Sequence, residues 1–289
     1  ALGVEAGRGA RRRAAGRFAL TASRKVRVLL CALVLVGAAM RVETIRQRRE
    51  WSHDDAMAIA MSSGATAASW AVLEGRWVPA ARWQELLSRT PGSPAPIDST
   101  GHVDVHPPLW LRVVDAATRA FGVNLWSVPA LNLAFAAGTG ALLFALARAL
   151  LGDPDDALLA LALWALSPGA IDTTAMERSY ELLALLTIGM AWLVLTGPGP
   201  RPRPAGARVV GIAALSVAGL LLHYLFAIVL AASLAVLLAA PRAPLRPRAP
   251  LVGALLLGPL ALPFLHPGLR ERLSFARRMS ARPEGAATA

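Results

Sequence analysis

Apolar segments separated by short polar connectors run through most of the chain. They occupy residues 28–40, 126–150, 157–171, 180–196, 209–239 and 251–265. A helix needs about 20 predominantly apolar residues to cross the hydrocarbon core of a bilayer, with a lower limit of about 17. The pattern therefore predicts a bundle of membrane helices with no separate water-soluble domain.

The segment 209–239 is too long for one straight crossing. The connectors on either side of it, residues 197–208 and 241–248, both carry several arginines. Because basic loops stay on the cytoplasmic side, both flanks can be cytoplasmic only if the segment crosses twice. We therefore predict a break at His223 and Tyr224, the most polar positions near its middle. This break places both residues at the outer surface.

Residues 43–125 are predicted to form a polar outer loop. The loop contains several tryptophans, which settle at the headgroup level, and it is not strongly basic overall. Within it, Asp54 and Asp55 precede a short apolar stretch and predict a helix start over residues 54–61.

A second helix is predicted in this loop over residues 109–122, after two consecutive prolines. Arg112, Asp115 and Arg119 recur at helical spacing on one stripe, with Leu and Val on the opposite side. A helix with one polar face suits the plane of the interface. A crossing helix whose polar stripe faces a protein cavity is the alternative.

Together these elements predict an all-α polytopic membrane protein with about seven transmembrane helices plus interfacial helices in a long first outer loop. The N-terminus is expected inside, because the basic stretch before the first helix is longer than the one after it; a cleavable signal peptide is the alternative. The predicted division is a basic cytoplasmic segment (1–27), a first transmembrane helix (28–42), an outer loop with the candidate motifs (43–125), a transmembrane bundle (126–266) and a polar tail (267–289).

Composition agrees with this assignment. Hydrophobic residues make up 55% of the 289 and charged residues 17%, with a mean hydropathy of +0.50. The net charge of +12 arises largely from arginines in connectors, so we do not interpret it as nucleic-acid binding. Cys31 is the only cysteine, which leaves neither a disulfide nor a cysteine metal site. The chain begins without Met and ends in a polar tail, as a fragment or a processed product does.

The predicted topology gathers ionisable and aromatic residues at the outer face. Placing an ionisable side chain at membrane depth costs free energy. Such side chains are usually retained where they pair with one another or line a substrate or ion pathway. They are Asp54, Asp55, Asp98, His102, Asp104, His106, Glu177, Arg178, Tyr180, His223 and Tyr224. Their concentration at one face, more than any single residue, predicts a functional site there.

These residues also have purely structural interpretations. Asp is favoured at the start of a helix. His106 is followed by two prolines, and such a triplet can also start a helix. Glu177, Arg178 and Tyr180 suit interfacial anchors, and the pair His223 and Tyr224 suits a polar helix break.

A metal site is permitted by the alternation of His102, Asp104 and His106, because all three point to one side of an extended segment. No helical pair of ligands at fixed spacing supports it. We therefore expect no cofactor, and a divalent metal is the less favoured alternative.

Taken in order, the motifs resemble those of the C-type membrane glycosyltransferases related to dolichyl-phosphate-mannose protein mannosyltransferases and bacterial aminoarabinose transferases (glycosyltransferase family 39-like). The resemblance covers residues 43–240. The matching motifs are His53-Asp54-Asp55-Ala56, DVHPPLW at 104–110, Phe121-Gly122, Ala165-Leu166-Ser167-Pro168 followed by Glu177-Arg178-Ser179-Tyr180, and Leu222-His223-Tyr224.

The resemblance implies an integral-membrane glycosyltransferase of the plasma (inner) membrane. Such an enzyme moves a sugar from a polyprenyl-phosphate donor to an acceptor hydroxyl of a protein, lipid or glycan on the outer face, with inversion. Asp54 aligns with the first acid of the family's Asp-Glu pair and is the implied general base. Asp55 stands where the family has Glu, which shortens its reach. The implied partners are the donor, the acceptor and the bilayer, with no nucleic acid.

The resemblance also implies a set of substrate-binding residues. Arg178 stabilises the leaving phosphate, for which its planar fork is suited. The others position the base, the phosphate or the sugar: His106, Asp104, Tyr180, His223 and Tyr224.

Two rival functions stay open at this point. A multi-span transporter or flippase predicts ionisable groups inside the spans, whereas here they gather at one face. An inactive, truncated structural homologue is favoured by the short chain, since longer members of the family carry further spans and often a C-terminal domain.

Overall fold

The computed structural model describes residues 2–63, 81, 107–196, 205–239, 249–266, 269 and 274. Every element defined in this part of the chain is a helix, which confirms the predicted all-α class for these residues. The helices are α1 (Leu2–Gln47), α2 (His53–Ser62), α5 (Leu109–Phe121), α6 (Ser127–Leu151), α7 (Pro154–Ala165), α8 (Pro168–Thr174), α9 (Tyr180–Leu195), α10 (Ala205–Leu222), α11 (Phe226–Ala239) and α12 (Ala249–Leu265).

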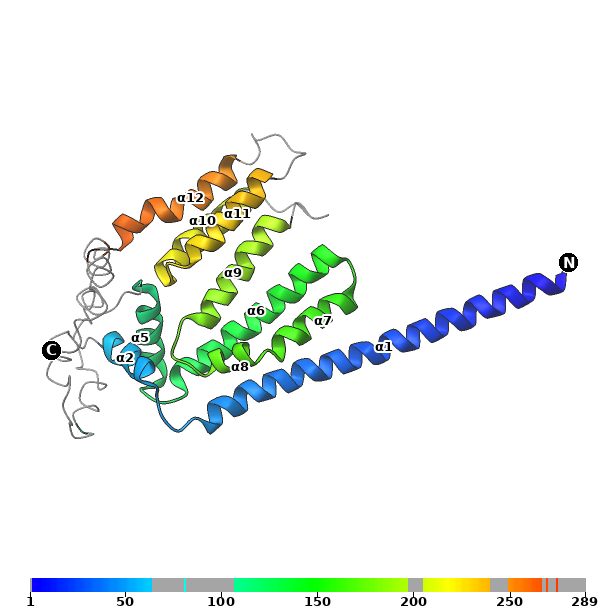
Figure 1. Ribbon diagram of the computed structural model, residues 1–289, viewed down its shortest axis with the longest axis horizontal. Coiled ribbons are helices and arrows are strands. Elements are labelled where there is room, and N and C mark those ends of the chain that lie inside the picture. The colour runs from blue at the N-terminus through cyan, green and yellow to red at the C-terminus, as the bar shows by residue number, and fades with distance from the viewer. Residues whose placement is uncertain are drawn as a thin grey trace, which may run out of the picture.

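The long apolar helices lie side by side in alternating directions (Figure 1). Helices α1, α7, α10 and α12 run towards one end of the bundle, and α6, α9 and α11 run away from it. We call this end, where α1 and α10 finish and α6 and α9 begin, the site end. The two short helices α2 and α5 lie there and pack against each other.

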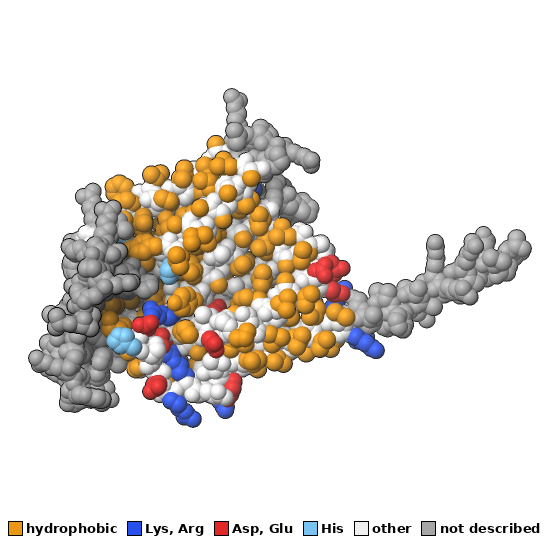
Figure 2. All heavy atoms as spheres, in the orientation of Figure 1, with side chains coloured by type: hydrophobic (Ala, Val, Ile, Leu, Met, Phe, Trp, Pro, Cys, Tyr) orange, Lys and Arg blue, Asp and Glu red, His pale blue; other side chains and the backbone are white. Residues whose placement is uncertain are grey.

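The exterior of the bundle is apolar between its two ends. Figure 2 shows hydrophobic side chains across the visible face, with charged side chains gathered towards the ends. Large hydrophobic side chains such as Leu35, Leu163 and Phe264 are 70%, 67% and 85% exposed. Such a surface suits lipid and not water, and the molecule is an integral membrane protein.

Two described helices are long and apolar enough to cross a bilayer alone, residues 24–47 of α1 and the whole of α6. Helices α7 and α8 meet this criterion together but are bent by 60°. The other apolar helices are α9, α10 counted from Gly206, α11 and α12, and each has 10–17 residues. The total of about seven crossings therefore remains a prediction.

The predicted break in the segment 209–239 is confirmed. Helix α10 ends at Leu222, α11 begins at Phe226, and the two run side by side in opposite directions (Figure 1). The predicted helices over 54–61 and 109–122 are also present as α2 and α5. On α5, Arg119 pairs with Asp115 at 2.9 Å on one face and Trp110 is buried on another. This arrangement confirms that α5 is amphipathic.

The segment 157–171 differs from the expectation of one straight helix. The chain bends between α7 and α8 because Ser167 precedes Pro168, and a residue before proline is pushed out of the helical region. The bend leaves carbonyl groups unpaired at the end of α7. Arg41 of α1 donates to the carbonyl oxygen of Ala165 at 2.6 Å, and its guanidinium lies 4.5 Å from the centre of the Trp164 ring.

Helix α12 contains a proline whose missing N–H is compensated by α10. Because Pro259 has no N–H, the carbonyl of Leu255 lacks its usual partner one turn later. The Ser216 hydroxyl of α10 donates to this carbonyl at 2.6 Å, and the N–H of Gly258 donates to the Ser216 oxygen at 3.2 Å. In an apolar environment these bonds fix how α10 and α12 pack.

The approach of α1 to α7 depends on Gly37, where an added Cβ would collide with the carbonyl oxygen of Ala165. We expect Gly37→Ala to lower the free energy of unfolding by about 1 to 3 kcal/mol, because the backbone there cannot shift freely. The matched control is Gly253→Ala in α12, where an added Cβ meets nothing within 4 Å. Thermal unfolding of the purified protein measures both, and equal midpoints would contradict this account of the contact.

Candidate functional site

Helix α2 presents two neighbouring carboxylates in different environments. Ser52 caps the helix: its hydroxyl oxygen accepts the Asp55 N–H at 3.2 Å, and the Asp55 carboxylate accepts the Ser52 N–H at 3.2 Å. This reciprocal capping box fixes the first turn. Asp55 is buried, with 3% of its surface exposed, whereas the side chain of Asp54 is 62% exposed.

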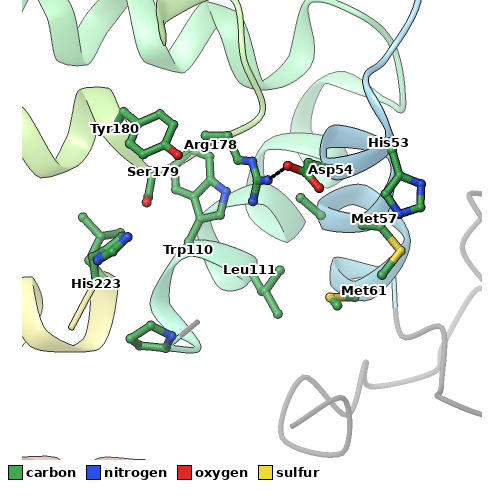
Figure 3. A pocket seen from close by; sticks show the side chains of 13 residues that line it. His53, Asp54, Met57, Met61, Trp110, Leu111, Arg178, Ser179, Tyr180 and His223 are labelled. Atoms are coloured by element: carbon green, nitrogen blue, oxygen red, sulfur yellow. Dashed lines mark ion pairs between the residues drawn. The ribbon is translucent and has the colours of Figure 1, made fainter. Parts of the chain in front are cut away.

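Asp54 forms an ion pair with Arg178, which lies in the connector between α8 and α9 (Figure 3). The Arg178 side chain is 25% exposed, so the pair lies at the surface of a recess. Two of the residues predicted from separate motifs are thus in direct contact.

Asp55 belongs to a buried group behind this pair, which we call the carboxylate cluster: Arg48, Asp55 and Glu177. Arg48 contacts both acids, at 2.5 Å from Nη2 to Asp55 Oδ2 and 2.6 Å from Nη1 to Glu177 Oε2. The backbone N–H of Glu177 donates to Asp55 Oδ1 at 2.9 Å. The cluster therefore ties the start of α2 to the connector that carries Arg178.

Three further side chains hold this connector. The Nε1–H of Trp51 donates to Glu177 Oε1 at 3.1 Å, and the Nε1–H of Trp110 in α5 donates to the Glu177 carbonyl at 3.0 Å. Asn132 of α6 donates to the Met176 carbonyl at 2.7 Å. Side chains of α2, α5 and α6 all form hydrogen bonds to the backbone of Met176 and Glu177. The backbone position of the adjacent Arg178 is therefore strongly determined.

The Glu177 side chain is fully buried, and burial raises its pKa to about 7; the nearby Asp55 charge also raises it, whereas Arg48 and Trp51 act in the opposite direction. The raised pKa means that the folded state keeps a proton which the unfolded chain has lost above about pH 4.5. This contribution to stability is complete below about pH 4.5 and disappears as the pH rises through 7.

We therefore expect wild-type protein to lose on the order of 2 kcal/mol of unfolding free energy between pH 5 and 8 relative to Glu177→Gln. Glutamine keeps an oxygen that can accept the Trp51 N–H but does not titrate. Unfolding curves of both proteins across this pH range provide the test. Parallel curves would show that Glu177 is ionised throughout.

Two cavities meet at the Asp54–Arg178 pair. The first, which we call the Met57 cavity, has a volume of about 180 Å³ and is bordered mainly by apolar side chains of α2 and α5, with His53 and His223 at its edge. The second, which we call the Trp51 cavity, has a volume of about 670 Å³ and is bordered mainly by polar side chains. Asp54, Arg178 and Tyr180 border both cavities.

His223 lies in the turn between α10 and α11 and faces the Met57 cavity (Figure 3). Its Nδ1 accepts the N–H of Leu225 at 3.2 Å, which leaves Nε2 as the protonated nitrogen of the neutral ring. Tyr224 is placed differently: its hydroxyl lies 2.9 Å from Nε2 of His266 after α12, and it is not among the described residues that border either cavity.

The structure thus brings Asp54, Arg178, Tyr180 and His223 together around one recess. Asp55 lies directly behind it. The remaining predicted site residues, Asp104 and His106, lie outside the described residues, as do Asp98 and His102.

Sequence reasoning missed three residues of this site: Arg48, Trp51 and Trp110. The sequence pattern presents Arg48 as one of the arginines that follow the first helix, Trp51 as a headgroup anchor, and Trp110 only as the last residue of the DVHPPLW motif. Arg48 lies 129 positions from Glu177 in the sequence, so no local pattern links them.

Comparison with known proteins bears on what this recess does. The family described as dolichyl-phosphate-mannose-protein mannosyltransferase matches residues 105–266, more than half of the chain. No curated protein and no solved structure matches it significantly. The matched region includes α5 to α12 and therefore Arg178, Tyr180 and His223, while Asp54 precedes it.

Proposed function

Because the chain belongs to the dolichyl-phosphate-mannose-protein mannosyltransferase family and is thus a membrane glycosyltransferase, we propose that it moves a sugar from a polyprenyl-phosphate donor to an acceptor hydroxyl, with inversion. The observation that carries the proposal is the pair of Asp54 and Arg178 at the junction of two cavities. One carboxylate and one guanidinium are the two charges that this reaction requires.

Asp54 acts as the general base in this proposal. Its carboxylate accepts the proton of the acceptor hydroxyl as that oxygen forms its bond to the anomeric carbon. The bond from the anomeric carbon to the phosphate oxygen breaks at the same time, and its electron pair leaves with the polyprenyl phosphate. The capping box holds Asp54 on a fixed helical turn, which favours catalysis because no ordering is needed in the transition state.

Arg178 stabilises the negative charge that accumulates on the departing phosphate. Its fork suits phosphate oxygens, and the bonds to Glu177 and Met176 hold the connector from which it extends. His223 borders the Met57 cavity and contacts the phosphate or the sugar there in this proposal. Asp55 positions Asp54 and Arg178 through the carboxylate cluster.

We assign the site end to the outer face of the plasma (inner) membrane and the N-terminus to the cytoplasm. The arginine-rich connectors 197–208 and 241–248 join helices whose ends lie opposite the site end, which supports this orientation. The match to a glycosyltransferase family favours an enzyme over the transporter alternative.

Incubation of the purified protein with a labelled polyprenyl-phosphate sugar tests the proposal. We expect transfer to an acceptor hydroxyl, and nuclear magnetic resonance of the product should show the opposite anomeric configuration to the donor. Retained configuration would overturn the single-step inverting mechanism. The absence of any turnover of the donor would overturn the proposed function.

A further inference from the structure

The two cavities that share Asp54 and Arg178 are bordered by different kinds of side chain. Met57, Met61, Leu111 and Leu222 make the Met57 cavity largely apolar. In contrast, the Trp51 cavity is bordered by hydroxyl, amide and carboxylate side chains: Thr44, Gln47, Glu50, Ser52 and Asp172. The base of the proposed reaction therefore borders two cavities with different sets of side chains.

We propose that the Trp51 cavity binds the acceptor, and that this acceptor is an uncharged saccharide. The inference rests on the proposed function and adds the acceptor class and its position. The Met57 cavity then takes the sugar and the first part of the lipid-linked donor, for which its apolar side chains and His223 are suited.

The position follows from the geometry of inversion. The attacking hydroxyl must approach the anomeric carbon from the side opposite the departing phosphate, so acceptor and phosphate occupy separate spaces on either side of the reacting carbon. The base must contact the acceptor hydroxyl from the same junction. Asp54 satisfies this requirement because it borders both cavities.

The acceptor class follows first from the hydrogen bonds at the Trp51 cavity, where three of the bordering side chains already donate within the protein. The Thr44 hydroxyl donates to the Met40 carbonyl at 2.9 Å, the Gln47 amide to Glu43 at 2.8 Å, and the Ser52 hydroxyl to Asp55 at 2.6 Å.

The Arg48 guanidinium is also engaged, because it pairs with Asp55 and Glu177, and Arg178 is assigned to the departing phosphate of the donor. The described wall therefore combines several acceptor oxygens with the Tyr180 hydroxyl, which both donates and accepts. A ligand rich in hydroxyl donors complements it, whereas a peptide backbone would also bring carbonyl oxygens that need donors.

The charge of the cavity wall further restricts the class of acceptor. Glu50 and Asp172 are exposed at this cavity, and neither pairs with a cation among the described residues. Two uncompensated carboxylates repel anionic acceptors such as phosphorylated lipids or uronic acids. An uncharged saccharide avoids this repulsion.

Trp51 supplies an aromatic surface to this cavity. Its indole borders the cavity, and the bond from its Nε1–H to Glu177 fixes the orientation of the ring. A fixed aromatic ring beside carboxylates offers both kinds of contact that a sugar needs, because a pyranose presents C–H groups between its hydroxyls.

A panel of acceptors tests the inference with one labelled polyprenyl-phosphate sugar as donor. It contains a neutral oligosaccharide, a serine- and threonine-rich peptide, and an oligosaccharide of uronic acids. We expect the neutral oligosaccharide to be used at least tenfold better, as kcat/KM, than either of the others. Equal or better use of the peptide or of the uronic-acid acceptor would overturn the inference.

Variants of the cavity wall give a second measurement. Glu50→Gln and Asp172→Asn should each raise the KM for the neutral oligosaccharide several-fold, and should raise kcat/KM for the uronic-acid acceptor. Asp156→Asn, an exposed acid in the first turn of α7, is the matched control and should change neither value. An unchanged KM in both cavity variants would also overturn the inference.

Failure of the inference is distinguishable from failure of the proposed function. Hydrolysis of the donor, with water as the acceptor, does not need the Trp51 cavity to recognise a saccharide. Hydrolysis without a preference for the neutral oligosaccharide would overturn only the inference. Loss of all donor turnover by the wild-type protein, including hydrolysis, would overturn the proposed function itself.

Discussion

Replacing Asp54 by Asn is expected to lower kcat for sugar transfer by about 10²- to 10⁴-fold, the usual contribution of a general base. Asparagine has almost the same shape but does not accept a proton from a hydroxyl. The ion pair with Arg178 is also lost. Because the Asp54 side chain is mostly exposed, that loss should cost the fold less than about 1 kcal/mol.

The matched control for Asp54→Asn is Asp156→Asn. Both residues are exposed acids in the first turn of a capped helix, but Asp156 belongs to α7 and begins at the opposite end of the bundle from the site. We expect it to keep wild-type activity. A single-turnover transfer assay and a thermal unfolding curve should be run on each variant. If Asp54→Asn keeps more than a tenth of the wild-type rate while folded, Asp54 is not the base.

The structure separates two acids that the sequence presents as a pair. Adjacent positions on a helix point about 100° apart, so the helix turns Asp54 towards the recess and Asp55 into the protein. The sequence predicts a helix start at both residues, because Asp is favoured in the first turn of a helix. It does not reveal which acid faces the substrate, since that depends on where Arg48 and Glu177 lie.

Features governed by local composition were predictable from the sequence. The break at His223 follows from segment length and from arginines on both flanks, and it is observed. The two-sided helix α5 follows from the spacing of its charges. The contact between Asp54 and Arg178 was expected only as a shared face, because the pattern assigns residues to one end of a bundle without setting distances.

Features that depend on contacts between distant segments could not be predicted. In the sequence, Ser216 is an ordinary polar residue of an apolar helix. Its role becomes visible only in the fold, where Pro259 of α12 leaves the Leu255 carbonyl unpaired beside it. In the sequence, Arg41 is likewise one of the arginines that flank an apolar segment. In the fold it donates to the Ala165 carbonyl, which the bend after α7 leaves unpaired. In both cases a polar side chain compensates for an irregularity in a helix that is remote in the sequence.

Replacing Arg48 by Met is expected to lower the free energy of unfolding by about 3 to 5 kcal/mol, because it leaves the buried acids Asp55 and Glu177 without their cation. Methionine retains much of the length of the side chain, so the loss reports charge more than volume. We also expect transfer activity to fall, since the cluster holds the connector that carries Arg178.

The neighbouring Arg49 provides the matched control, because it is exposed and has the same flexible side chain. Arg49→Met should change the unfolding midpoint by less than a degree or two, as surface substitutions usually do. Neutralising the stranded acids should then restore stability: Arg48→Met combined with Asp55→Asn and Glu177→Gln is expected to unfold closer to wild type than Arg48→Met alone. If the triple variant is no more stable than the single one, burial of charge is not the reason for the loss. Arg48 would then act through packing and through its bond to the Ala175 carbonyl.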